Sequence, residues 1–488
     1  MGVEIIFLTP CDNQESSLKK LLTKSLFTVL FFIFVVLFSF SCAYNKEPDL
    51  NEIGMDITSE NPETERYGTV TAAPQPVTEK ETEPPETKPV TAAATETEKP
   101  SPPQEETISG QTSVPVITGT TNVSPTLICI AGTCEPDAKI YIRGGIEEVS
   151  YVSDFKYFIG TVEIPASGSA KLAVSARVKG KSESEAVAVS GTYKAAAKQI
   201  RDDAFEVIVG NNYQCHFISA LADYTGTNLL TDDQRKTVET NAKQNVAWLN
   251  KNMPGTELIY LVLPNPMTIY PETVPLRYEQ NVGTTRTEQF CAAAAKGGAV
   301  VINTTDVFKS HKSDEFKLFH KTDSHWTEYG AWLAYTELMN YISQKYPAAA
   351  PRTFDEMGFY TKDVNGGDMP YYLELDYTKV RELAVFANPS FKSPADLLFF
   401  RSTEDLLMNH DTTPKAATYT TGNTNLPNIY VMRDSFGIAM YNMLPDRFNK
   451  TTYKAMWSYG FDQNDIKSSG TNYVLYLIAE RNLGELIY

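Results

Sequence analysis

Apolar and polar positions alternate in two different ways along this chain, and the change divides it into regions. Over residues 197–488, short continuous apolar runs alternate with longer segments of helical spacing. Continuous apolar runs between turn residues are typical of strands buried on both faces, so this region predicts an α/β domain with a parallel sheet and helices on both faces. The expected strands are residues 205–209, 258–263, 299–302, 428–432 and 473–478, and the expected helices are residues 232–250 and 327–346.

Residues 123–196 show shorter runs with strand-like alternation, separated by turn residues. This pattern predicts a small antiparallel β-sandwich. The expected strands are residues 126–130, 139–142, 158–162, 172–176 and 186–189. The turn at residues 131–138 resembles that of bacterial immunoglobulin-like surface domains. The sandwich could serve as a spacer or as a glycan-binding module.

Residues 1–42 have the composition of an export or anchor segment. Three lysines, at positions 19, 20 and 24, precede an apolar run over residues 26–40, which is shorter than the roughly 20 residues of a spanning helix. The run ends in Ser41-Cys42 and resembles a bacterial lipoprotein signal, which implies lipidation of Cys42. The alternative is an uncleaved helical anchor, and both place the rest of the chain outside the bacterial membrane and attached to it.

Residues 43–122 are rich in Thr, Glu, Pro and Ala and have few apolar anchors. Such a segment buries too little apolar surface to offset its ordering entropy, so a disordered stalk is expected. The chain has a net charge of −17, and residues 43–110 hold 15 Asp and Glu against 5 Lys and Arg. The remainder is therefore only mildly acidic, and nothing in its charge favours nucleic-acid binding.

The six cysteines do not form a disulfide framework. Cys129 and Cys134 are close enough in sequence to pair, and the sequence leaves that open. The Cys and His residues also lack the spacing of a zinc site, so no metal is expected.

The strongest candidate for chemistry is the serine in Arg433-Asp434-Ser435-Phe436-Gly437, directly after the expected strand at residues 428–432. A strand-to-helix turn lifts a hydroxyl clear of the sheet and leaves backbone N–H groups unpaired at the helix start. Those donors, around Phe436 and Gly437, suit an oxyanion. Gly437 would let the helix start approach the strand closely.

Asp323 and His325 are the candidates for activating that serine. Residues two apart do not face each other on a helix, so both should lie in an extended or turn segment before the helix that Thr327 caps. Asp323 could then orient His325 through Nδ1, leaving Nε2 to take the proton of Ser435. The alternative is a loop histidine beside a packed Trp326.

These motifs resemble a known family. The runs Thr322-Asp323-Ser324-His325-Trp326 and Arg433-Asp434-Ser435-Phe436-Gly437 are similar to those of SGNH-hydrolase-like proteins of the alginate O-acetylation type and of bacterial proteins with an Asp-His-His-Trp motif. Supporting stretches are residues 261–265, residues 366–368 before a helix, and the final strand running into Glu480-Arg481. Two positions depart from the family pattern: Ser324 replaces a histidine and is expected to point away, and Pro266 replaces a lysine.

The resemblance implies an SGNH- or flavodoxin-like fold and a Ser435-His325-Asp323 triad, without metal or diffusible cofactor. It also implies an extracellular or cell-wall polysaccharide as acceptor and a membrane-bound O-acyltransferase as a partner that supplies acetyl. A glycan O-acetyltransferase, a carbohydrate acetylesterase and a non-catalytic glycan-binding protein remain the alternatives.

Several other residues have two open interpretations. Asn265 could donate to an oxyanion or shape a turn. Arg433 could hold an anionic sugar or the acetyl oxygen, or it could form a structural ion pair. Asp434 is expected to brace the serine turn through backbone N–H groups. The pairs Gly367-Asp368 and Glu480-Arg481 are expected to be a turn and a buried ion pair, and His216, His311, His320 and His410 ordinary surface or core residues.

Overall fold

The computed structural model describes residues 108–194, 207–395 and 414–487. The predicted signal segment with Cys42, residues 43–107 of the predicted stalk and His410 lie outside these ranges. The predicted end of the disordered stalk at residue 122 was wrong, because strand β1 (Val116–Asn122) forms within it and pairs with β2 (Leu127–Thr133). Within them, no helix combines the length and the apolar character that crossing a membrane requires.

The first described region contains two antiparallel sheets that share one apolar core. Their strands are β1 (Val116–Asn122), β2 (Leu127–Thr133), β3 (Lys139–Arg143), β4 (Val149–Val152), β5 (Tyr157–Glu163), β6 (Ser169–Arg177) and β7 (Val187–Thr192). The sheet orders are β1-β2-β5 and β4-β3-β6-β7. Alternate residues of β2 and β3, such as Ile128 and Ile140, meet in the shared core, as the period-2 pattern requires. Every predicted strand lies in or overlaps an observed one, and the sequence missed β1 and β4. Cys129 and Cys134 are free thiols.

The second region is built on a six-stranded sheet of order β11-β10-β17-β15-β16-β14. Its strands are β10 (Glu257–Leu263), β11 (Val300–Asn303), β14 (Ala416–Thr420), β15 (Asn428–Arg433), β16 (Lys450–Ala455) and β17 (Tyr473–Ala479). All neighbours pair in parallel except β14 and β16, which are antiparallel. The predicted α/β class is confirmed, with the correction that the sheet is mixed rather than wholly parallel.

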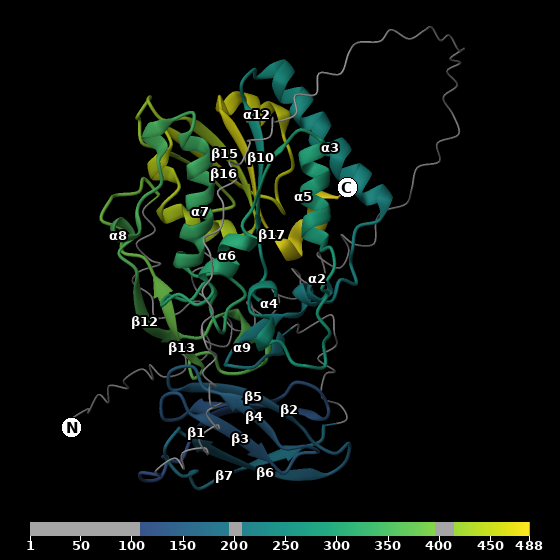
Figure 1. The fold of residues 1–488 in the computed structure, drawn as a ribbon, viewed down its shortest axis with the longest axis vertical. Coiled ribbons are helices and arrows are strands. Elements are labelled where there is room, and N and C mark those ends of the chain that lie inside the picture. Colours follow the sequence, from purple (N-terminus) through teal and green to yellow (C-terminus); the bar gives the residue numbers. More distant parts are fainter. Residues whose placement is uncertain (1–107, 195–206, 396–413, 488) are drawn as a thin grey trace, which may run out of the picture. The chain divides into compact units, whose positions relative to one another are not determined.

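Helices cover both faces of this sheet, which is why its strands are apolar on both sides (Figure 1). Helix α7 (Glu328–Ser343) packs on one face with strand residues such as Leu261 and Val431. Helices α3 (Asp232–Asn252) and α5 (Arg286–Lys296) pack on the other with Tyr260 and Met432. The remaining helices are η1 (Ile218–Ala220), α2 (Leu221–Thr225), α4 (Pro266–Ile269), η2 (Pro271–Thr273), α6 (Thr305–His311), η3 (Pro347–Ala349), α8 (Phe354–Met357), α9 (Asp368–Tyr372), η4 (Ser435–Asn442), η5 (Pro445–Arg447), α12 (Gln463–Ser469) and η6 (Glu480–Leu486).

Two small antiparallel pairs lie outside the main sheet. Strand β8 (Val207–Val209) pairs with β9 (Cys215–Phe217), and β12 (Tyr360–Asn365) pairs with β13 (Arg381–Phe386). The prediction that residues 205–209 contribute a strand to the parallel sheet was therefore wrong, because an apolar run does not reveal which sheet it joins.

His216 in β9 gives this region a predictable acid sensitivity. The side chain is buried, its Nε2 lies 2.8 Å from Thr273 Oγ1, and its Nδ1 has no hydrogen-bond partner in the part of the chain that the structure describes. Burial lowers the pKa of His216 to about 3. Between its ordinary pKa and that value the unfolded chain binds the proton more readily, so the free energy of unfolding should fall as pH falls, by up to about 1.4 kcal/mol per pH unit.

Urea unfolding at pH 7 and pH 4.5 tests this expectation. His216→Gln should remove part of the acid sensitivity, whereas His311→Gln, at a more exposed position, should retain it. Equal acid sensitivity in all three proteins would contradict the assignment to His216.

Candidate active site

Ser435 lies at the turn between β15 and the 3-10 helix η4, at the carboxyl edge of the sheet. Asp434 caps the turn by accepting from Phe436 N at 2.9 Å, and its other oxygen accepts from Ala479 N at 2.7 Å. This is the bracing role predicted for Asp434. A Cβ at Gly437 would lie 2.7 Å from Arg433 Cβ, so the absence of a side chain permits the close approach of helix and strand.

Asp323 and His325 lie in the irregular segment directly before α7, where the spacing placed them. The Thr327 side chain caps the helix by accepting from Gly330 N at 3.2 Å. Trp326 Nε1 donates to the Phe436 carbonyl at 2.9 Å. The tryptophan is therefore more than a packed neighbour, since it ties the Asp-x-His segment to the serine turn.

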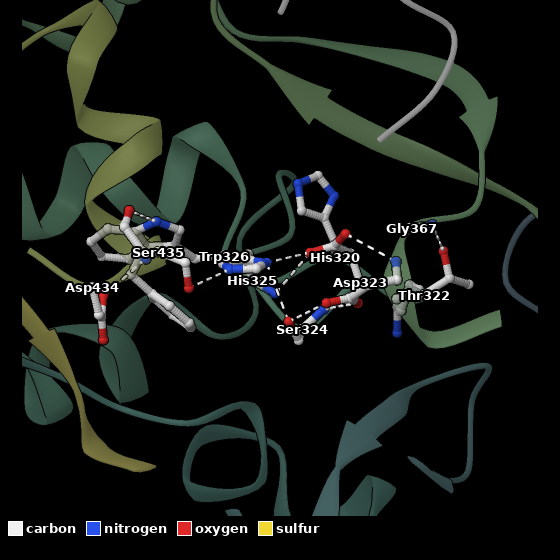
Figure 2. A network of polar contacts seen from close by, with 12 residues as sticks. His320, Thr322, Asp323, Ser324, His325, Trp326, Gly367, Asp434 and Ser435 are labelled. Atoms are coloured by element: carbon white, nitrogen blue, oxygen red, sulfur yellow. Dashed lines mark hydrogen bonds and ion pairs between the residues drawn. The ribbon is translucent and has the colours of Figure 1, made fainter. Parts of the chain in front are cut away.

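Ser435, His325 and Asp323 form a continuous line of hydrogen bonds (Figure 2). His325 Nε2 lies 2.8 Å from Ser435 Oγ, and His325 Nδ1 lies 2.7 Å from Asp323 Oδ1. Asp323 Oδ1 also accepts from His325 N at 3.0 Å, which fixes the carboxylate relative to the ring. With the Nδ1 proton directed to Asp323, Nε2 is the acceptor that faces the serine hydroxyl. Asp323 and His325 are buried and Ser435 is partly exposed.

A buried glutamate, Glu382 in β13, holds the start of this segment. Its carboxylate accepts from Thr322 N at 2.6 Å, from Thr322 Oγ1 at 2.5 Å and from Lys321 N at 3.1 Å, and it lies 3.0 Å from His320 Nδ1. His320 is therefore part of the scaffold around the site, and Glu382 had no recognisable signal in the sequence because 60 residues separate it from Thr322.

The Ser324 side chain was expected to point away from the site and Asp368 to belong to a turn outside it. The structure contradicts both expectations. Ser324 Oγ donates to Asp368 Oδ2 at 2.5 Å and lies 3.2 Å from His325 Nδ1, so this side chain points toward the catalytic candidates. Ser324 N donates to Asp368 Oδ1 at 2.7 Å, and Asp368 N donates to Asp323 Oδ2 at 3.2 Å. The only sequence signal for the role of Asp368 was the Gly367-Asp368 pair, which the sequence analysis interpreted as an ordinary turn.

Gly367 is required for the close contact between this turn and Asp323. A Cβ at position 367 would lie 2.2 Å from Asp323 Oδ2. We expect Gly367→Ala to displace the carboxylate and to lower activity by about 100-fold, the scale of a misplacement of about 1 Å. Gly460→Ala is the matched control, because nothing lies within 4 Å of the added Cβ there. Equal activity of the two variants would show that the contact has no influence on the site.

Arg481, which follows β17, also belongs to this site. Its Nη1 donates to the Ser324 carbonyl at 2.9 Å, and its guanidinium lies over the Phe436 ring at 4.7 Å. Burial lowers the pKa of Arg481, and the carboxylates of Asp434, Asp368 and Asp323 oppose that effect. The predicted buried ion pair of Glu480 with Arg481 is wrong, because Glu480 instead accepts from Asn265 N, Thr268 and Thr287.

The backbone donors expected around Phe436 and Gly437 are already used inside the turn. Phe436 N donates to Asp434 Oδ1, and Gly437 N donates to the Asp434 carbonyl at 3.3 Å. The amide of Ser435 itself makes no hydrogen bond within the described ranges. The prediction that the amides of Phe436 and Gly437 bind the oxyanion is therefore wrong, and the amide of Ser435 is the candidate donor instead.

Asn265 and Arg433 point to other protein groups. Asn265 is fully buried and donates through Nδ2 to Asp223 at 3.2 Å, and burial raises the pKa of that aspartate. The Arg433 guanidinium donates to Tyr441 Oη at 3.2 Å and to the carbonyls of Asp434 and Pro414. Within the described ranges, Arg433 thus braces the turn through neutral oxygens and forms no ion pair.

One group of side chains in the described ranges could hold a metal ion. Asp323, His325 and Asp368 each offer one ligand atom, and these atoms lie within 4.8 Å of one another. Within this group, His325 Nδ1 and Asp323 Oδ1 are joined by the hydrogen bond of 2.7 Å given above. Metal binding at Nδ1 would displace the proton that Asp323 accepts, so the two uses of this cluster exclude each other.

Part of the chain is similar to known proteins. Residues 224–411 match the family model described as SGNH hydrolase-like domain, acetyltransferase AlgX. The similarity to this family covers less than half of the chain. The match includes Asp323, His325 and Asp368 and ends before Ser435. The chain is also 27% identical over 157 residues to a probable alginate O-acetylase AlgJ of Pseudomonas syringae pv. tomato, covering 30% of this chain and only 40% of that relative's length.

Solved structures with similarity to the chain come from several bacteria. PatB1 of Bacillus cereus is 14% identical with a TM-score of 0.41 and covers 52% of this chain and 92% of that structure. A DHHW family protein from Eubacterium siraeum is 16% identical with a TM-score of 0.38, covering 51% and 88%. The O-acetyltransferase domain of Pseudomonas putida AlgJ is 14% identical with a TM-score of 0.36, covering 57% and 91%.

Proposed function

We propose that the protein is a glycan O-acetyltransferase that carries the acetyl group on Ser435. The supporting observation is the hydrogen-bonded line of Ser435 Oγ, His325 Nε2 and His325 Nδ1 with Asp323 Oδ1, at 2.8 and 2.7 Å. A nucleophile, a base and an orienting carboxylate in this order perform acyl transfer on unrelated folds. The matched family model is described as an acetyltransferase, and one relative is named a probable alginate O-acetylase.

In the first half-reaction Ser435 Oγ attacks the carbonyl carbon of an acetyl donor while His325 Nε2 takes the hydroxyl proton. Asp323 stabilises the imidazolium that forms. The bond to the leaving group breaks, and His325 returns the proton to it. In the second half-reaction a sugar hydroxyl gives its proton to His325 and attacks the acetyl-serine carbonyl. Ser435 Oγ leaves and takes the proton back, and the sugar ester departs.

The negative charge that develops on the carbonyl oxygen needs a donor close to Ser435. The Ser435 N–H is the best candidate, because it is the amide of the turn that has no partner within the described ranges. An amide donor held in place before the reaction stabilises the oxyanion without reorganisation.

A carbohydrate acetylesterase is the second candidate. It would use the same three residues with water in place of the sugar hydroxyl. Ser435 is partly exposed to solvent, so water can reach the acetyl group unless an acceptor covers it.

The substrate and the setting are part of the same proposal. The acceptor is an extracellular or cell-wall polysaccharide, and a membrane-bound O-acyltransferase supplies the acetyl group. The protein is held at the outer side of the bacterial membrane through lipidated Cys42 or an uncleaved N-terminal helix.

Acceptor dependence separates the alternatives. The purified full chain is incubated with 4-nitrophenyl acetate, with and without oligosaccharides from bacterial cell walls and exopolysaccharides. Release of 4-nitrophenol, acetate and acetylated sugar is followed in parallel. A transferase should release 4-nitrophenol faster in the presence of one class of sugar and should form the acetyl ester of that sugar.

The other outcomes point elsewhere. Equal release of acetate with and without sugar would identify an esterase. Sugar binding without any Ser435-dependent turnover would identify a glycan-binding protein and remove the proposed function.

A further inference from the structure

We propose that Asp368, acting through Ser324 Oγ, is a second positioning group for His325. The proposal rests on the proposed function, because it assigns His325 the role of base. The carboxylate lies at the start of α9, 45 residues after Asp323, and reaches the site from a different element. Figure 2 shows Ser324 beside the hydrogen bond that joins His325 to Asp323.

The direction of the Ser324 hydroxyl proton follows from its two neighbours. Asp368 Oδ2, 2.5 Å away, accepts the hydrogen bond that the Ser324 hydroxyl donates. The oxygen then presents a lone pair to His325 Nδ1, 3.2 Å away. The Nδ1–H group therefore has two acceptors, a strong one in Asp323 Oδ1 and a weaker one in Ser324 Oγ that Asp368 polarises.

Asp368 also fixes Asp323 itself. Its backbone amide donates to Asp323 Oδ2 at 3.2 Å, and its side chain accepts from Ser324 N at 2.7 Å. Asp368 thus holds both the Asp323 side chain and the backbone of Ser324, which lies between Asp323 and His325. A positioned carboxylate behind a serine hydroxyl stabilises the imidazolium more than the neutral imidazole.

The charged groups around this pair come from several elements. Asp323 precedes α7, Asp368 begins α9, Asp434 precedes η4 and Arg481 lies in η6. Arg481 donates to the Ser324 carbonyl and is attracted by all three carboxylates. Its charge limits the net negative potential, so the effect of Asp368 should be carried mainly through the Ser324 hydroxyl.

The test compares Asp368→Asn, Ser324→Ala, the double variant and Ser324→Thr in the full chain. Acylation by 4-nitrophenyl acetate is measured as kcat/KM between pH 5 and pH 8.5. Each single variant should lose about 10-fold, and the acid limb of the pH profile should move to lower pH by about half a unit, because the imidazolium has lost a stabilising neighbour. Ser324→Thr, which keeps the hydroxyl, should retain most of the activity.

The double variant gives the decisive comparison. If Asp368 acts through Ser324, losing both costs little more than losing one, whereas independent effects multiply to about 100-fold. Asp355→Asn, an exposed aspartate with the same change in charge, should leave the rate and the pH profile unchanged.

Other results would overturn the proposal. Rates that fall only as the thermal unfolding midpoint falls, with the acid limb unmoved, would make the pair merely structural. Multiplying effects would show that Asp368 does not act through Ser324. If Ser435→Ala and Asp323→Asn also left acylation intact, the proposed function rather than this positioning role would be at fault.

Discussion

Ser435→Ala is expected to lower acetyl transfer from 4-nitrophenyl acetate by at least about 10⁴-fold, because no acetyl-enzyme can form. The hydroxyl removed is the group 2.8 Å from His325 Nε2. Stability should change little, since Ser435 is partly exposed and the turn is held by Asp434 and by Trp326, which bonds the neighbouring carbonyl. Initial rates and the thermal unfolding midpoint measured on the same preparations give both quantities.

Ser190→Ala is the matched control for this variant. Ser190 is an exposed serine in β7, outside the sheet that carries the site. Its rate should equal that of the unmodified protein. A Ser435→Ala rate within about 10-fold of the unmodified one would mean that another nucleophile carries the reaction.

Asp323→Asn is expected to lower the same rate by about 10³- to 10⁴-fold. Asp323 Oδ1 accepts from His325 N and Nδ1, and Oδ2 accepts from Asp368 N. An asparagine must turn its NH₂ group toward one of these N–H donors, so either orientation sets a donor against a donor. With the NH₂ toward His325, the ring takes the other tautomer and Nε2 can no longer accept the serine proton.

The control for this variant is Asp355→Asn, which removes the same charge at an exposed position. The pH profile of the residual activity is a second observable, because the loss should persist at every pH if the tautomer is the cause. Recovery of normal activity at high pH would instead indicate that Asp323 acts only through its charge.

The main features of the fold could be predicted because burial on both faces is recorded in the strands themselves. In β10, β15 and β17 almost every residue is apolar, and alternate residues enter the cores on opposite faces. Strand β16 was missed because its sequence, Lys450 to Ala455, contains two lysines and two threonines. Its burial comes from its neighbours β15 and β14 rather than from its own pattern.

The central site residues could be predicted because each motif is local. Asp323 and His325 are two positions apart, and Ser435 follows an apolar run. The groups that support them could not be predicted in the same way, because they are distant in sequence. Asp368 lies 44 residues after Ser324, to which it bonds, and Arg481 lies 157 residues after Ser324.

The oxyanion expectation failed for a related reason. A helix start leaves amides unpaired in general, but here the Asp434 side chain and carbonyl accept from Phe436 and Gly437. Asp434 was expected to brace the turn. Whether this bracing occupies the amides that could bind an oxyanion depends on which amides donate to Asp434. Only the three-dimensional arrangement specifies that.

The covalent step is the central claim, and mass spectrometry of the quenched protein tests it most directly. The full chain is mixed with 4-nitrophenyl acetate, acidified within seconds and analysed intact and after proteolysis, beside Ser435→Ala and His325→Ala. The account predicts one added acetyl group on Ser435, absent from Ser435→Ala, formed far more slowly in His325→Ala and lost when an acceptor sugar is added. Equal labelling of Ser435→Ala, or an acetyl group found only on other residues, would contradict it.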